Sequence, residues 1–236
     1  MKDKALLHFF KKITIPVVLV SVLWVIKIVE NSFNLRFVRY GIYPREVDAL
    51  PGIFTSPFIH SDFNHLISNS FPLLILISVM ILFYRRVALF SLLLITLFTG
   101  LSVWIFARPS YHIGASGVVY GLVSFVFWSG IFRKNVKSII LSLIVLILYS
   151  GLFLGILPPE ASNISWESHL AGGIVGIFVA LLFKDVTEQD EKFLRYPWQD
   201  DDSPAQYLLP RDVFEKTIAQ RLKEEEERDA QEYLGH

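Results

Sequence analysis

Six long apolar segments constrain this chain more than any other feature of its sequence. They cover approximately residues 13–30, 64–83, 87–107, 115–132, 138–156 and 168–183. Most approach the roughly 20 residues that an α-helix needs to cross a bilayer. Lipid offers the backbone no water to bond, so a helix, whose hydrogen bonds are internal, is the expected form. The sequence therefore predicts an all-α polytopic membrane protein, a bundle of six transmembrane helices.

The composition agrees with a membrane protein. Of the 236 residues, 53% are hydrophobic and 19% are charged, whereas about a quarter are charged in an ordinary soluble domain. The chain has no cysteine, which excludes disulfide bonds and thiolate metal sites. No basic patch interleaved with aromatic residues lies on a soluble segment, so we expect no nucleic-acid partner.

The first apolar segment has some features of a signal peptide, because four lysines precede it: Lys2, Lys4, Lys11 and Lys12. However, it is long for such a segment, and Glu30-Asn31-Ser32-Phe33 after it lacks a small-x-small cleavage site. Lys27 lies near its far end, where a long side chain is expected to snorkel to the interface. We therefore predict an uncleaved first transmembrane helix.

Basic residues in the short loops predict the orientation. They cluster before the first segment and at Arg85-Arg86, Arg133-Lys134, Lys137 and Lys184. The loop 157–167 has no Lys or Arg. The positive-inside rule then places both termini in the cytoplasm, although Arg36, Arg39, Arg45 and Arg108 lie on the other side. We expect a prokaryotic cell (inner) membrane.

Three regions follow from these patterns: a cytoplasmic N-terminal segment (1–12), a six-helix membrane domain (13–184) and an acidic cytoplasmic tail (185–236). Residues 184–236 hold 15 acidic and 8 basic side chains, a net charge of −7, so the remainder carries +7. Helix-forming residues from Arg211 to Leu234 predict a short helix in the tail.

Polar side chains open three of the apolar segments. In the predicted topology the second, fourth and sixth segments run in the same direction, so their first residues lie at similar depth near the outer face. These include His65 and Asn69, Ser116, and His169. A serine beside a histidine that takes its proton is an activated nucleophile. No Asp or Glu is placed to orient His169, so the pattern indicates a dyad rather than a triad.

Small residues surround both members of this pair. Gly114 and Gly117 flank Ser116, and Gly172 and Gly176 follow His169 on one helical face. Taken alone, these glycines indicate only helix packing. Such packing would also bring Ser116 and His169 within reach. Tyr120, one turn after Ser116, is expected to support the imidazole.

His65 and Asn69, four residues apart, share one helical face and are candidate donors to a developing oxyanion. The alternative interpretation is a helix cap with interfacial histidines. A zinc site built from His60, His65 and His169 is a weaker alternative, because no His-Glu-x-x-His motif is present. We expect no metal and no cofactor.

Three motifs in order resemble the rhomboid intramembrane serine proteases. They are His60-x4-His65-x3-Asn69, Gly114-Ala115-Ser116-Gly117 and His169-x-x-Gly172-x-x-x-Gly176. The resemblance covers roughly residues 10–185. It implies that Ser116 is the nucleophile, His169 the general base, His65 and Asn69 the oxyanion hole, and that Tyr120 packs against His169. It also implies single-pass or membrane-anchored protein substrates, cleaved near the outer ends of their membrane helices.

Two other functions are open at this point. One is a catalytically silent rhomboid-like protein that binds or escorts membrane helices, and the other is a small transporter. The polar groups cluster near one face, and no pair of broken helices is apparent, which disfavours a transporter. Residues 157–167, with Pro158-Pro159, are a candidate cap over the site. The sequence predicts no oligomeric state.

Overall fold

The computed structural model describes residues 2–151, 155, 165–186, 188 and 216–234. The chain separates into two compact units, residues 1–189 and residues 190–236. Helices and 3₁₀ turns form the regular structure of the described residues, in which strand-like pairing is confined to an isolated bridge between Ile42 and His112. The all-α prediction is confirmed.

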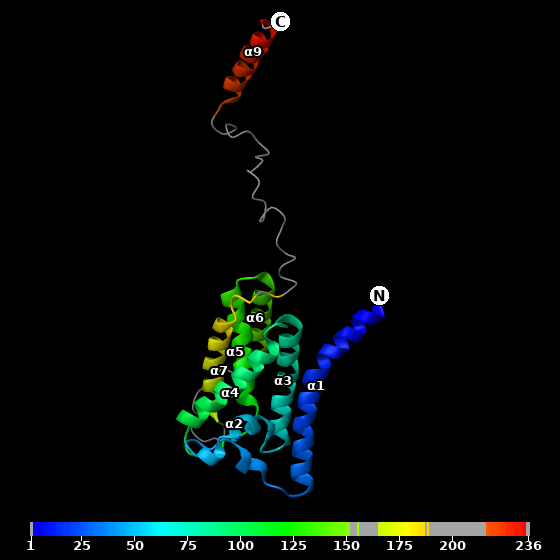
Figure 1. Cartoon of the computed structure of the whole chain (residues 1–236), viewed down its shortest axis with the longest axis vertical. Helices are drawn as coiled ribbons and strands as arrows, with labels where there is room; N and C mark the ends of the chain where they lie inside the picture. Colours follow the sequence, from blue (N-terminus) through cyan, green and yellow to red (C-terminus); the bar gives the residue numbers. More distant parts are fainter. Residues whose placement is uncertain (1, 152–154, 156–164, 187, 189–215, 235–236) are drawn as a thin grey trace. The chain divides into compact units, whose positions relative to one another are not determined.

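The first unit is a bundle of long helices (Figure 1). They are α1 (Lys2–Ser32), α3 (Phe63–Phe83), α4 (Ala88–Phe106), α5 (Ser116–Arg133), α6 (Val136–Tyr149) and α7 (Trp166–Leu182). The segment between α1 and α3 carries a short helix, α2 (Gly52–Thr55), and 3₁₀ turns at Phe37–Tyr40, Val47–Ala49 and Ser56–Phe58.

Four helical segments are long and apolar enough to cross a membrane: Ile13–Ser32, Phe63–Phe83, Ala88–Phe106 and Ser116–Arg133. They agree within a few residues with the first four predicted spans. The other two apolar helices, α6 and α7, are shorter, with 14 and 17 residues. The fifth span was predicted to reach residue 156, but 152–154 and 156 lie outside the described residues. Helix α1 also begins earlier than predicted, at Lys2.

Short polar residues directly precede two of these helices. Asp62 precedes α3 and accepts a hydrogen bond from the backbone N–H of His65 at 2.9 Å. Asn135 precedes α6 and accepts from the N–H of Ser138 at 2.8 Å. Both are N-caps, which satisfy backbone donors that a helix leaves free at its start. Lys134, with φ 53°, makes the tight turn between α5 and α6.

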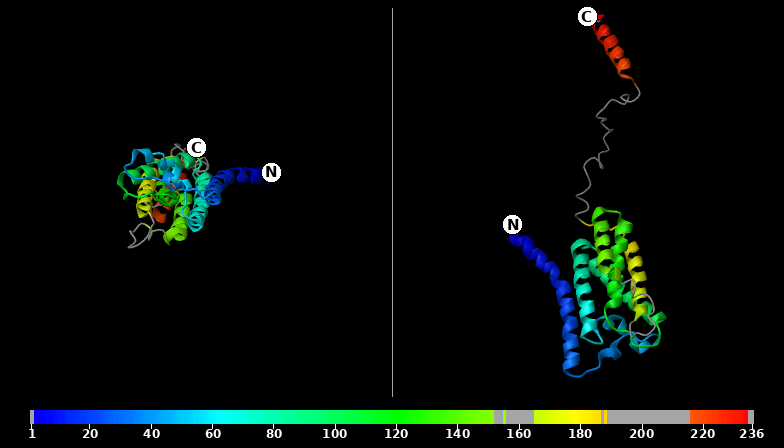
Figure 2. Two further views of the ribbon diagram at one scale, coloured as in Figure 1. Left: turned by 90° about the horizontal axis from the view of Figure 1, so that it is seen from below. Right: turned by 180° about the vertical axis from the view of Figure 1, so that it is seen from behind.

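Helices α3, α5 and α7 all begin at the end of the bundle where α2 lies (Figures 1 and 2). A hydrogen bond from Gly114 N to the Ser56 carbonyl, 2.9 Å long, ties the start of α5 to this end. Helix α5 is central, because it packs against α7, α6, α4 and α3, and its Leu122, Phe125 and Val126 are fully buried. The first residues of three helices are therefore brought to the same depth.

Lys27 does not snorkel, so that expectation was wrong. The residue is only 8% exposed, and its Nζ donates to the carbonyl oxygens of His60 (2.9 Å) and Ser61 (3.0 Å). The same Nζ forms an ion pair with Glu30 at 2.9 Å. Three acceptors match the three protons of an ammonium group, so the charge is satisfied inside the protein. Lys27 thus joins the end of α1 to the residues that precede α3.

Glu188 also belongs to the first unit. Its buried carboxylate accepts from the backbone N–H of Arg86, with N–O distances of 3.2 and 3.3 Å. The described part of the second unit contains α9 (Ile218–Leu234), within the range predicted to form a helix. Of the candidate cap 157–167, residues 157–164 lie outside the described part of the chain.

Candidate active site

Ser116 is the first residue of α5, and His169 lies in the first turn of α7. The distance between Ser116 Oγ and His169 Nε2 is 2.9 Å, which is a hydrogen bond. His169 is buried, with 7% of its surface exposed, whereas Ser116 is partly exposed. The structure therefore brings the two residues of the predicted dyad into direct contact across 53 positions of sequence.

The second ring nitrogen of His169 reveals the tautomer. Nδ1 lies 2.8 Å from the carbonyl oxygen of Gly155. A carbonyl oxygen can only accept, so Nδ1 carries the proton. In the neutral ring, Nε2 then has a free lone pair and accepts the Ser116 hydroxyl proton. This is the arrangement that a serine nucleophile requires of its base.

No carboxylate orients His169 among the residues that the structure describes. Glu167, the nearest in sequence, forms an ion pair with Arg108, with 3.2 Å between Oε1 and Nε. Its partner is therefore the loop before α5 rather than the imidazole. A backbone carbonyl takes the place that a carboxylate has in a triad.

Tyr120 stacks on His169. The ring centroids are 4.2 Å apart and the planes differ by 6°. Tyr120 lies one turn after Ser116 on α5, so the same helix supplies the hydroxyl and the surface that holds the imidazole. With Gly155 on one ring nitrogen and Ser116 on the other, the imidazole is fixed in both position and plane.

Glycines let α5 and α7 approach closely. A Cβ on Gly172 would overlap the carbonyl oxygen of Gly117, and one on Gly176 would overlap the carbonyl oxygen of Gly121. A Cβ on Gly117 would lie 3.1 Å from the carbonyl oxygen of Ser168. The helices thus meet backbone to backbone, as small residues permit in membrane proteins.

The His65 ring packs against Gly114, two residues before Ser116. The Gly114 φ is +100°, and a Cβ there would lie 2.6 Å from both Cε1 and Nε2 of His65. The imidazole of His65 therefore fills the space beside the loop that leads into Ser116. Its Nδ1 lies 3.2 Å from Ser61 Oγ. Hydrogen bonds from His65 N–H and the Ser61 hydroxyl hold the pKa of the Asp62 carboxyl below its usual range.

Asn69 is buried one turn further along α3, and its Nδ2 donates to the His65 carbonyl oxygen at 2.9 Å. Within the described ranges, neither His65 nor Asn69 forms a hydrogen bond with Ser116. The structure thus brings His169 into contact with both Ser116 and Tyr120, places the His65 ring beside Gly114, and joins Asn69 to the His65 carbonyl. No group of three His, Asp or Glu side chains suited to a metal ion occurs among the described residues.

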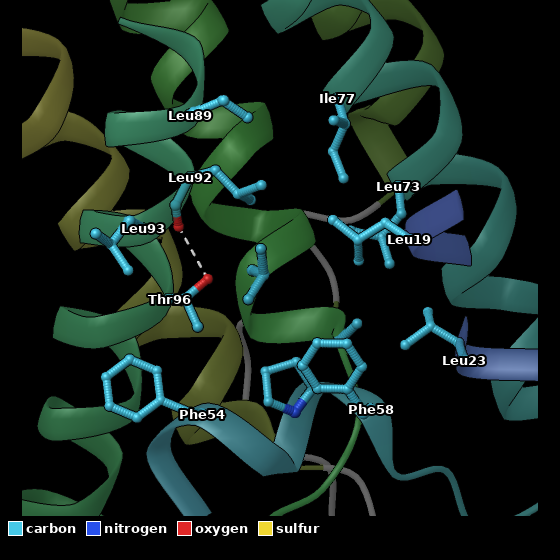
Figure 3. A pocket seen from close by; sticks show the side chains of 13 residues that line it. Leu19, Leu23, Phe54, Phe58, Leu73, Ile77, Leu89, Leu92, Leu93 and Thr96 are labelled. Atoms are coloured by element: carbon cyan, nitrogen blue, oxygen red, sulfur yellow. Dashed lines mark hydrogen bonds between the residues drawn. The ribbon is translucent and has the colours of Figure 1, made fainter. Parts of the chain in front are cut away.

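An apolar pocket of about 300 Å³ lies on another side of α5 (Figure 3). Leu19 and Leu23 of α1, Leu73 and Ile77 of α3, and Ala115 and Val118 beside Ser116 are among the residues that line it. Its one hydroxyl, that of Thr96, donates to the Leu92 carbonyl oxygen at 2.9 Å. The lining of this pocket therefore offers no free polar side chain, in contrast to the Ser116 and His169 side of α5.

Comparison with known proteins gives the family. The model of the Rhomboid domain matches residues 48–185, which is more than half of the chain. The chain belongs to the rhomboid family. As a rhomboid protein with several long apolar helices, it is an integral, multi-pass membrane protein. The match includes the helices that carry Ser116, His169, His65 and Asn69.

Proteins of three mycobacterial species resemble the chain in sequence. A protein of Mycobacterium tuberculosis and one of Mycobacterium bovis are each 30% identical to it over 171 residues, covering 69% of this chain and 71% of the relative. A protein of Mycobacterium leprae is 28% identical over 170 residues, covering 69% and 67%. All three are described as uncharacterized, so they assign no activity.

Sequence reasoning missed Gly155 at this rhomboid site. It contributes only its carbonyl oxygen, and every residue has one, so no side-chain pattern marks it. Gly176 was predicted to be a packing residue, but its close approach to the Gly121 carbonyl oxygen was not predicted. Pairing of that kind depends on how two helices are placed against each other.

Proposed function

We propose that this rhomboid protein is an intramembrane serine endopeptidase, with Ser116 as nucleophile and His169 as general base. The observation that carries the proposal is the 2.9 Å contact between Ser116 Oγ and His169 Nε2, with the Gly155 carbonyl fixing the tautomer. Rhomboid proteins are generally serine proteases, although some members are inactive, so membership supports the proposal without deciding it.

Acylation uses each of these contacts. Ser116 Oγ attacks the carbonyl carbon of the substrate peptide while its proton passes to His169 Nε2. The carbonyl oxygen becomes an oxyanion, for which we assign the backbone N–H of Ser116, the His65 ring and the Asn69 amide as donors. Asn69 has a second N–H beyond the one given to His65. The peptide C–N bond then breaks, and His169 returns the proton to the leaving amine.

Hydrolysis of the ester repeats these steps with water. His169 Nε2 takes a proton from the water, whose oxygen attacks the acyl carbon and releases Ser116 with its proton restored. The products are the carboxylic acid of the substrate and the free enzyme. The partial exposure of Ser116 supports access of water to the acyl group.

The proposed substrates are single-pass or otherwise membrane-anchored proteins, cleaved near the outer ends of their membrane helices. A membrane helix satisfies its backbone groups internally, so it must unwind locally before a carbonyl can reach Ser116. Helix-weakening residues near the cleavage point should therefore increase turnover.

Serine-directed probes and point variants test this function. Ser116→Ala and His169→Ala should each abolish cleavage of a membrane-anchored reporter and labelling by a fluorophosphonate, with thermal stability retained. Ser78→Ala is the matched control, because Ser78 Oγ bonds only within its own helix, to the Leu74 carbonyl oxygen. Near-normal cleavage in the Ser116 variant would overturn the proposal. A wild-type protein that binds membrane helices but takes no label would favour the escort function instead.

The proposal includes six membrane-crossing helices and cytoplasmic termini in a prokaryotic cell membrane. Helix α7, at 17 residues, is at the lower limit for a span, and α6 is shorter still. Single cysteines can be added cleanly, because the chain has none. In intact cells, a membrane-impermeant maleimide should label Asp48→Cys, between α1 and α3, and spare Lys134→Cys, between α5 and α6. The reverse pattern would contradict this orientation.

A further inference from the structure

A second histidine–serine hydrogen bond joins the two segments that precede Ser116 and His169. His112 Nδ1 is 2.6 Å from Ser165 Oγ, and the two residues are 53 positions apart, as are Ser116 and His169. His112 lies four residues before Ser116, and Ser165 lies four residues before His169. The segments that lead into α5 and α7 are therefore joined by a contact that runs parallel to the one between Ser116 and His169.

His112 is held in place by its burial and by its own hydrogen bonds. It is 3% exposed, and its backbone exchanges two hydrogen bonds with Ile42, of 2.8 and 3.0 Å. Its Nε2 lies 3.1 Å from the Arg108 carbonyl oxygen, so Nε2 carries the proton and Nδ1 accepts from the Ser165 hydroxyl. Burial lowers the pKa of His112, although the Arg108 carbonyl and Glu167 oppose the shift, and this favours the neutral ring that the bond requires.

Ser165 connects His112 to the first turn of α7 through hydrogen bonds. Its hydroxyl lies 2.6 Å from the hydroxyl of Ser168, and its carbonyl oxygen accepts from the N–H of Ser168 (3.1 Å) and of His169 (3.4 Å). The ion pair between Arg108 and Glu167 joins the same two segments. A first helical turn frays readily, so His169 needs such ties to keep its place.

We infer that His112 and Ser165 are positioning residues that set the distance between Ser116 and His169. The inference rests on the proposed function, because it assigns the pair a role in the reactivity of Ser116. Among the described residues, neither side chain forms a hydrogen bond with Ser116 Oγ or the His169 ring. They act on the backbones that carry these groups, where misplacement by about 1 Å can lower a rate by about a hundredfold.

The test is the rate at which a small fluorophosphonate acylates Ser116, since this probe needs no docking of a substrate helix. His112→Ala and Ser165→Ala should each lower the rate at least about tenfold. The double variant should react no more slowly than the slower single variant, because both changes remove one contact. His112→Asn should restore most of the rate, because its amide oxygen can accept from Ser165 where Nδ1 did.

Ser110→Ala is the matched control, because Ser110 Oγ lies in the same loop at 3.4 Å from His112 Nε2 but does not join α7. It should react at the wild-type rate. Unchanged rates in His112→Ala and Ser165→Ala, or additive losses without rescue by Asn, would overturn the inference while leaving the proposed function intact. A wild-type protein that takes no label at Ser116 would overturn the proposed function and, with it, this inference.

Discussion

The His169 ring depends on Gly155 for its orientation, and Gly155 has room for nothing larger than hydrogen. A Cβ there would overlap the Tyr120 hydroxyl and lie 3.3 Å from His169 Nδ1. Because the same residue both bonds the imidazole and borders the ring stacked on it, any side chain at 155 must displace one or both rings.

Gly155→Ala should therefore lower the rate of Ser116 acylation by about tenfold or more, with little loss of thermal stability. Gly151→Ala is the matched control, because a Cβ at Gly151 would have no heavy atom within 4 Å. Fluorophosphonate labelling kinetics on both variants give the comparison. Equal rates in the two variants would show that the Gly155 carbonyl does not orient the base.

Lys27 is expected to contribute to stability rather than to catalysis. Lys27→Met would leave the carbonyls of His60 and Ser61 without their donor, and would leave Glu30 with only the Phe37 N–H and no opposite charge. Removing one partner of a buried ion pair costs about 3–5 kcal/mol, so the unfolding temperature in detergent should fall clearly. Arg36→Met changes an exposed cation a few residues after the end of α1 and should alter stability by less than about 0.5 kcal/mol. Similar melting curves for the two variants would contradict this role.

At the scale of elements, the α5–α7 contact holds the two halves of the dyad together. The helices lie close because Gly172 and Gly176 face carbonyl oxygens of Gly117 and Gly121. Between lipid-exposed helices there is no hydrophobic driving force, so close packing and hydrogen bonds must hold them. Ser124 adds such a bond, from its Oγ to the Gly173 carbonyl oxygen at 2.6 Å.

Alanine substitutions at two glycines of α7 should distinguish the effect of this packing on stability from the effect of helix propensity. Gly172→Ala forces a methyl group against the Gly117 backbone and should destabilise the protein by about 1–3 kcal/mol, with loss of acylation. Gly173→Ala meets no atom within 4 Å and should be neutral or slightly stabilising, since Ala favours helix. Thermal unfolding of the two variants checks the prediction, and destabilisation by both would argue against a specific contact.

At the scale of the whole molecule, stability should depend on pH through His60. This residue is 1% exposed, lies between α2 and α3, and neither ring nitrogen has a hydrogen-bond partner in the described structure. Burial, aided by the nearby His65, lowers the pKa of His60 from 6.5 to about 4. The unfolded chain therefore binds a proton at His60 at a higher pH than the folded protein does.

The sign follows from linkage: stability is full above about pH 6.5 and falls as the pH is lowered toward 4, by at most about 3 kcal/mol. His60→Phe should keep the stability measured at pH 7, because no hydrogen bond is lost, and should lose part of the acid sensitivity. Unfolding temperatures of both proteins between pH 7 and pH 4.5 measure this. An unchanged acid sensitivity in the variant would exclude His60 as the group responsible.

Much of the fold and the site could be predicted from sequence. The four long spans were located within a few residues, because apolar composition over about 20 residues is a local property. Ser116 and His169 were identified as polar residues that open two predicted spans at similar depth, and Tyr120 by its place one turn after Ser116; the structure puts both Ser116 and Tyr120 in contact with His169. The boundaries were less predictable: α1 begins at Lys2, and Glu188 belongs to the first unit.

The sequence alone was sufficient for the four long apolar helices, the family resemblance and the identities of the candidate dyad, since apolar composition and motif spacing are local properties of the sequence. The partners of Lys27, the Gly155 carbonyl on His169 and the contact between His112 and Ser165 depend on tertiary structure. These contacts join residues 33, 14 and 53 positions apart. Such pairs form only once the helices have packed, because packing decides which carbonyl or hydroxyl lies within about 3 Å of each donor.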